Sequence, residues 1–436
     1  MKRLLMPWIV PVVLLTATPI AWAADPAGLP TVRSISETEL ITPVDVVGDD
    51  VASSLPEWGT TACSDASCNG RRGACSWCRP QWYGQADFLI WWTQGNRVPP
   101  LVTTSPNGTP RPQAGVLGQP GTQILSGGNS IDGNYRPGAR FTMGRWLNPC
   151  HSAGLEVTWF TLGDGSNSGN FFASSTGDPI LARPFFNTQN AANDAQLVAF
   201  PNIIQGAVQV QTSSEINSVS VDLRRNWRNT CRTRIDLLGG YRFVRFREGI
   251  AIRENLSSTD PGGLVPIGTT FDIGDAFNAR NDFNGGEIGL STRLKRGCWS
   301  FDMLTKLAFG NMHQRVAIDG STVVTVPGNG TTQSAGGLLA LPTNIGVQSR
   351  DRFALIPELN LNCRYQYSEQ LSLEVGYSLL WITDVARSGS QIDTNVNPTY
   401  LPGAGGTPTG PAVPSNPMHT ASMWAQGLNV GVAWEF

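Results

Sequence analysis

The sequence is poor in charge and in histidine. Charged residues make up 15% of the 436 residues, and there are three histidines. Lys and Arg number 31 against 33 acidic residues, which gives a formal net charge of −2. Proteins that bind nucleic acids carry a basic surplus that neutralises phosphates. We therefore expect no nucleic-acid partner.

Long apolar runs are also missing. After the first 23 residues, no window approaches the ~18 consecutive apolar residues that a membrane helix needs. The mean hydropathy of −0.13 is ordinary for a water-soluble protein. A membrane-spanning β-barrel has the same signature, because its apolar residues alternate with polar ones instead of forming runs.

The chain begins with the pattern of a secretory signal. Lys2 and Arg3 precede an apolar stretch over 4–15, and Ala21-Trp22-Ala23 is a small-x-small cleavage site. The short apolar run and its prolines argue against a membrane anchor. We predict a signal peptide at 1–23, cleavage, and export across the inner membrane, where cysteines can oxidise.

The end of the chain alternates with a period of two. Successive side chains of a strand point to opposite faces, so one face here is large and apolar and the other is small or polar. This ending resembles the C-terminal insertion signal of bacterial outer-membrane β-barrels, which implies the barrel-assembly machinery as a partner. The signal residues are Trp424, Leu428, Val430, Val432, Trp434 and Phe436.

The same alternation recurs from Trp82 onward, most clearly over 371–381. Such segments have about the nine to eleven residues that a tilted strand needs to cross a bilayer. They lie near 82–93, 138–146, 155–159, 218–224, 233–247, 287–294, 299–309, 353–365, 371–381 and 424–436. Residues 316–326 either add a hairpin or extend a strand.

The connections between these segments alternate in length. Short ones at 147–153, 226–232, 296–298 and 366–370 alternate with long ones at 94–137, 163–213, 250–283, 311–350 and 383–421. This alternation is typical of short periplasmic turns and long outer loops. We predict an all-β fold, a closed antiparallel transmembrane β-barrel of about ten strands (eight to twelve) over 82–436. A water-soluble sandwich or propeller is the alternative.

Residues 24–81 differ from the rest and read as a periplasmic tether with a cysteine-rich segment. Zinc binding and a redox role are alternatives for this segment, but structural disulfides fit an exported chain better. Four further cysteines lie at or beside the short turns, so we hypothesise that disulfides lace the tether across the periplasmic mouth. The candidates are Cys63, Cys68, Cys75, Cys78, Cys150, Cys231, Cys298 and Cys363.

Three segments are similar to the putative beta barrel porin-7 family. They are Trp82-Tyr-Gly-Gln-Ala-Asp-Phe-Leu-Ile-Trp-Trp92, Gly138-Ala-Arg-Phe-Thr-Met-Gly144 and Leu237-Leu-Gly-Gly-Tyr-Arg-Phe-Val-Arg-Phe246, together with the terminal Phe436. The resemblance implies a barrel in the bacterial outer membrane. It implies little about activity.

If the apolar face meets lipid, the opposite face carries nearly balanced charges into the lumen. A charged constriction would filter solutes, whereas a paired network would plug a narrow barrel. We favour the plug slightly and expect small conductance or none. The lumen candidates are Asp87, Arg140, Glu156, Asp222, Arg224, Arg242, Glu287, Arg293, Asp302, Lys306, Glu358, Arg364 and Glu374.

Catalysis is the competing class, because some outer-membrane barrels are hydrolases. His151 lies on the turn side, and His313 and His419 could meet at the outer rim with Asp384 or Asp319. The stretch at 164–169 has some features of a calcium loop but lacks its distal Glu. We expect no enzyme, cofactor or metal. The predicted function is a small porin passing solutes passively, and the alternative is a non-conducting surface-display barrel.

Overall fold

The computed structural model describes residues 81–163 and 169–436. No helix in these ranges is long and apolar enough to span a membrane. The 3-10 helices are η1 (Arg111–Gln113), η2 (Gly389–Gln391) and η3 (Pro398–Tyr400). The strands are β1 (Trp82–Thr93), β2 (Asn96–Arg97), β3 (Val102–Ser105), β4 (Gln123–Ser126), β5 (Ser130–Ile131), β6 (Tyr135–Trp146), β7 (Ala153–Leu162), β8 (Phe171–Ser175), β9 (Ile180–Asn187), β10 (Ala192–Ala199), β11 (Ile204–Asn229), β12 (Thr233–Ser258), β13 (Thr270–Arg296), β14 (Trp299–Val326), β15 (Gly330–Ala335), β16 (Gly346–Gln366), β17 (Leu371–Ala386), β18 (Asn395–Val396) and β19 (Thr420–Glu435).

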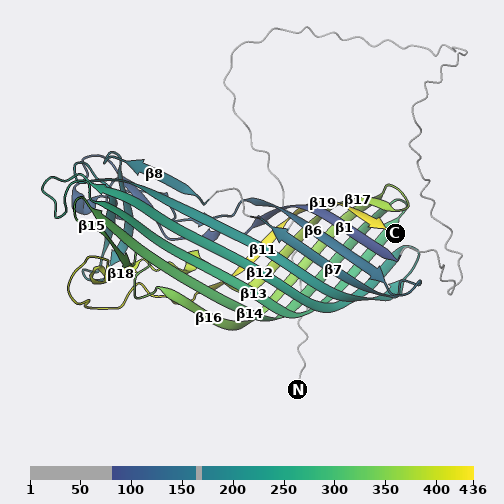
Figure 1. Ribbon diagram of the computed structural model, residues 1–436. Coiled ribbons are helices and arrows are strands. Elements are labelled where there is room, and N and C mark those ends of the chain that lie inside the picture. Colours follow the sequence, from purple (N-terminus) through teal and green to yellow (C-terminus); the bar gives the residue numbers. More distant parts are fainter. Residues whose placement is uncertain (1–80, 164–168) are drawn as a thin grey trace, which may run out of the picture. The chain divides into compact units, whose positions relative to one another are not determined.

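Ten of the strands form a ring of antiparallel pairs. The order is β1-β6-β7-β11-β12-β13-β14-β16-β17-β19, and β19 pairs back with β1 over Tyr83–Thr93. Figure 1 shows these strands side by side and steeply tilted. The all-β class and the count of about ten strands are therefore confirmed.

The connections divide the ring into two ends. The turn end holds the short connections 147–152, 230–232, 297–298 and 367–370, as predicted. The loop end holds the long ones, and β8, β15 and β18 lie there, away from the C-terminus (Figure 1). Three predicted loops, 163–213, 250–283 and 311–350, are mostly strand. In the last two, β12 continues to Ser258, β13 begins at Thr270 and β14 continues to Val326. Residues 316–326 extend β14, and 321–326 of this extension pair with β15.

The strands continue because their two faces exchange character along their length. In β12 Tyr241 is 50% exposed on the outer face, while its neighbour Arg242 is buried inside. Four residues further, Phe246 is buried and Arg247 is exposed. The alternation keeps its period of two, but the apolar side chains move from the outer face of the sheet to its inner face. The extended strands thus build an ordinary water-facing sheet with its own core.

A second sheet lies in the long connections. It has five strands, in the order β10-β9-β3-β4 with β18 beside β9. It shares one apolar core with the extended ring strands, including Val102, Leu181, Ile252, Phe277 and Leu339, all at most 1% exposed. We call this core and its sheet the cap. It follows that the loop end is folded and tightly packed.

Candidate functional site: the filled interior of the ring

A layer of ion pairs occupies the interior of the ring near the turn end. All the charged residues predicted for the lumen take part, at N–O distances of up to 3.9 Å. They are Asp87, Arg140, Glu156, Asp222, Arg224, Arg242, Glu287, Arg293, Asp302, Lys306, Glu358, Arg364 and Glu374.

Several contacts in this charged layer cross the ring. Lys306 Nζ on β14 lies 2.7 Å from Asp222 Oδ2 on β11, although β12 and β13 separate these strands. Lys306 also lies 2.9 Å from Glu287 on β13. The same Glu287 lies 2.8 Å from Arg242, which contacts Glu358 on β16 as well. These side chains therefore bridge the interior between strands that are not neighbours in the ring.

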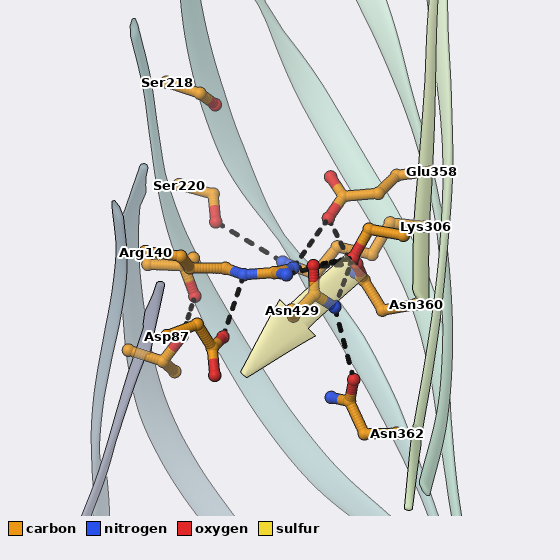
Figure 2. A network of polar contacts seen from close by, with 12 residues as sticks. Asp87, Arg140, Ser218, Ser220, Lys306, Glu358, Asn360, Asn362 and Asn429 are labelled. Atoms are coloured by element: carbon orange, nitrogen blue, oxygen red, sulfur yellow. Dashed lines mark hydrogen bonds and ion pairs between the residues drawn. The ribbon is translucent and has the colours of Figure 1, made fainter. Parts of the chain in front are cut away.

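Arg140 connects the opposite wall to this layer. Its Nε lies 3.1 Å from Asp87, its Nη1 donates to Asn360 Oδ1 at 2.7 Å, and its Nη2 donates to Ser378 at 2.9 Å. Figure 2 shows Arg140 and Asp87 reaching from one wall toward Glu358, Lys306 and Asn360 on the other. Every polar group of the Arg140 guanidinium thus meets a partner, as a buried arginine requires.

The sequence analysis missed three participants in the layer. Asp236 is 2% exposed and accepts from Arg234 Nε at 2.8 Å. Tyr83 donates its hydroxyl to Glu156 at 2.8 Å. Asp236 and Arg234 stand two residues apart on β12, with the same parity as Arg242. Extending that parity toward the turn would have identified them.

An apolar layer closes the interior on the loop side of the ion pairs. Its members face inward from every ring strand except β6. Trp91, Phe283, Ile356, Leu380 and Ile382 are 0% exposed. Trp91 also donates its indole N–H to Asn429 of the polar layer at 2.9 Å. The sequence analysis named only charged residues for the lumen and did not predict this apolar layer.

A polar cavity of about 320 Å³ extends from the turn end into the charged layer. Its walls include Tyr83, Arg224, Arg293, Asp302 and Cys298. Arg234 and Trp146 also line it, and the Arg234 guanidinium lies 4.2 Å from the centre of the Trp146 ring. The cavity continues into the charged layer, where Arg140, Lys306 and Glu358 line it, and it reaches Phe160 of the apolar layer.

The cap is held to the ring by a second buried charge cluster. Arg183 on β9 lies 2.5 Å from Glu254 on β12 and 2.7 Å from Asp275 on β13. Asp275 Oδ1 also accepts the backbone N–H groups of 338–340 at 2.8–3.1 Å. Burial raises the pKa of the Glu254 carboxyl, and Arg183 opposes that rise. Burial acts to lower the pKa of Arg183, but Asp275 and Glu254 outweigh it and raise that pKa.

Comparison with known proteins decides the family. The family described as Putative beta barrel porin-7 matches residues 83–436. The chain belongs to this family. No curated protein matches it.

Solved structures resemble this member of the family only distantly. The outer membrane protease OmpT of Escherichia coli shares 10% identity, with 85% of this chain and 100% of that chain covered and a TM-score of 0.39. A FadL homologue of Pseudomonas aeruginosa shares 9% identity, with 82% and 91% covered and a TM-score of 0.23. The P. putida toluene transporter TodX shares 6% identity, with 82% and 90% covered and a TM-score of 0.18.

The cysteines of this porin-7 family member divide into two groups. Cys150, Cys231 and Cys298 lie in turn-end connections, and none of them is a free thiol. Cys363 is free and exposed, so its assignment as a disulfide candidate is wrong. It lies within β16, in register with Phe301 and Val375, and its side chain is on the apolar outer face of the ring. The remaining candidates, Cys63, Cys68, Cys75 and Cys78, lie outside the described residues, as do 1–23, nearly all of 24–81 and 164–168.

The histidines do not meet. His151 is buried at the turn end and stacks on Trp146 with ring centres 5.1 Å apart. His313 lies 3.0 Å from Asp351 on the outer face, not beside Asp384 or Asp319. His419 bonds through its backbone to Gln391. Within 81–163 and 169–436 there is no group of three or more His, Cys, Asp or Glu residues that could hold a metal ion.

Proposed function

We propose that the ring is a closed β-barrel spanning the bacterial outer membrane, and that its interior does not conduct. In this proposal the barrel anchors the folded cap at the cell surface. The observation that carries it is the apolar layer, to which all ring strands but β6 contribute, stacked directly on the charged layer. Water and ions have no polar route through such a layer.

An apolar band on the outer face supports the membrane orientation. On β14 the band runs from Trp299, 56% exposed, to Phe309, 41% exposed. Eleven tilted residues at ~3.4 Å each cover about 25 Å, the height of the apolar band in outer-membrane barrels. Leu428, Val430 and Phe436 of the C-terminal signal are also exposed on this face. Lipid as a partner, and insertion by the assembly machinery, follow from this orientation.

Closure is required by the same environment. Backbone N–H and C=O groups at a sheet edge cannot stay unpaired in hydrocarbon, so a membrane sheet must return to its first strand. The pairing of β19 with β1 meets that requirement.

A small porin that passes solutes passively is the second candidate, favoured by the polar cavity at the turn end. Planar-bilayer recording of the purified mature protein separates the two functions. We expect no steady openings, whereas steady conductance of nanosiemens size would refute the filled interior. A variant lacking residues 25–80 tests the tether in the same recording. If this variant conducts ions and the mature chain does not, the tether blocks the pore.

The tether would brace the turn end of the barrel through disulfides to Cys150, Cys231 and Cys298. Non-reducing peptide mapping tests this bracing. Peptides that join any of these three cysteines to Cys63, Cys68, Cys75 or Cys78 would support it, and Cys63–Cys68 with Cys75–Cys78 pairs would end it. The three histidines are held apart and contact different groups, so they do not form a shared acid–base pair.

A further inference from the structure

Three arginines stand in one row across the outer face of the ring. Arg247 on β12 is in register with Arg280 on β13, and Arg280 is in register with Arg315 on β14. Along its strand, each arginine is an even number of residues from an exposed apolar residue nearer the turn end. All three side chains therefore lie on the outer face of the ring. Neighbouring strands lie ~4.8 Å apart, which places the three guanidinium groups within about 10 Å along the row. We call this set the arginine row.

Acidic partners among the described residues do not fully neutralise these three arginines. Like charges directly opposite each other on neighbouring strands destabilise a sheet. Arg247 has only a distant partner, Glu215 at 3.9 Å, and both side chains are 45% exposed. Arg280 lies 2.7 Å from Asp282, which also holds Arg245 at 2.6 Å. Arg315 has no ion pair among the residues that the structure describes. Because Asp282 is shared with Arg245 and Arg315 lacks an acidic partner among the described residues, the row keeps an excess of positive charge.

The row lies just beyond the apolar band on the loop side. Phe353, 67% exposed, pairs in register with Asn311, and Arg315 stands four residues further along β14. At ~3.4 Å per tilted residue, Arg315 is about 10 Å past Phe353, the exposed aromatic on the neighbouring strand β16. Lipid headgroups begin where the hydrocarbon ends and occupy the next ~5–8 Å of a bilayer. Arginine side chains are long enough to reach them.

We propose that the arginine row binds the phosphate groups of an anionic lipid in the leaflet that surrounds the loop end. Planar guanidinium groups match phosphate oxygens in pairs, and three in a row fit a headgroup with more than one phosphate. The acyl chains of the same lipid would lie on the apolar band below. This inference rests on the proposed transmembrane orientation.

The turn end provides a matched control. Arg225, Arg228 and Arg296 lie there, but they do not form a row: Arg225 is in register with Leu237, Arg228 with Ile235 and Arg296 with Trp299. A variant that replaces these three with Gln loses the same charge as Arg247→Gln/Arg280→Gln/Arg315→Gln. Only the second variant removes the row.

The test measures retention of bis-phosphorylated lipid A by the full-length mature protein, by native mass spectrometry after a lipid titration. Each arginine near an anionic surface contributes about fivefold in binding, so the row variant should bind about a hundredfold more weakly. The turn-end variant and the wild type should bind alike. Dephosphorylated lipid A should bind the wild type and both variants equally. Millimolar inorganic phosphate should not displace the phosphorylated lipid.

Equal retention by the row variant and the turn-end variant would overturn the inference. Displacement by inorganic phosphate would overturn it in favour of a free-anion site. Protease protection in vesicles is measured on the same samples and reports insertion independently. A mature chain that stays soluble without detergent would refute the transmembrane proposal, whereas an inserted chain without lipid preference refutes the arginine row alone.

Discussion

Replacing Arg242 with Met should strongly destabilise the ring. Arg242 is 2% exposed, and its guanidinium lies 2.8 Å from Glu287 and also contacts Glu358. Without it, Glu287 keeps Lys306 at 2.9 Å, but Glu358 keeps only Asn360 and Arg140, the latter at 3.9 Å. Removing one partner of a buried pair leaves a poorly compensated charge, which costs about 3–5 kcal/mol.

The double variant Arg242→Met/Glu358→Gln tests that reasoning. It removes both charges of the pair and leaves Glu287 with Lys306, so most of the lost stability should return. The free energy of unfolding is measured by urea titration in lipid vesicles for the wild type, both single variants and the double variant. The reasoning is refuted if Arg242→Met costs less than about 1 kcal/mol, or if the double variant is as unstable as the sum of the singles.

Three further outcomes follow from other parts of the structure. Phe283→Ala leaves a cavity in the apolar layer and should cost about 3–5 kcal/mol in the same titration, with Phe353→Ala on the outer face as a much milder control. At Gly427 a Cβ would lie 2.2 Å from the Ile90 carbonyl oxygen, so Gly427→Ala should destabilise by about 1–3 kcal/mol; Gly274→Ala, where the nearest atom is 3.6 Å away, should be nearly neutral. Burial raises the pKa of Glu254 above its unfolded value of about 4.3. Its contribution to the stability of the cap is therefore complete below that pH and is lost as the pH rises through the pKa of the folded state. Hydrogen exchange of the 338–340 amides, corrected for intrinsic rates, should therefore speed up with pH in the wild type and not in Glu254→Gln.

The period-two pattern was sufficient to predict the ring strands and their short turns. It succeeded because burial on one side of a sheet fixes the parity of every side chain in a strand. The same parity placed Asp87, Arg242 and Lys306 on one face of their strands. It could not show that Lys306 meets Asp222 across two intervening strands, because such contacts depend on the curvature of the ring.

The prediction went wrong where the two faces exchange character. Residues 250–258 and 270–283 were read as loop, although Ile252 and Phe277 are 0% exposed inside the extended strands. Their outer face is polar, and in the proposed transmembrane orientation water, not lipid, covers it there. A pattern sought as apolar-out and polar-in does not recognise the reverse, even with the period unchanged.

The sequence by itself determined the ring strands near the turn end, their faces and the charged residues that would need partners, because alternation and desolvation act locally and on each residue. Only the tertiary structure decided that the interior is filled, since that depends on how far apart opposite walls stand. It also decided the alignment of Arg247, Arg280 and Arg315, which belong to three strands and are brought level by register alone.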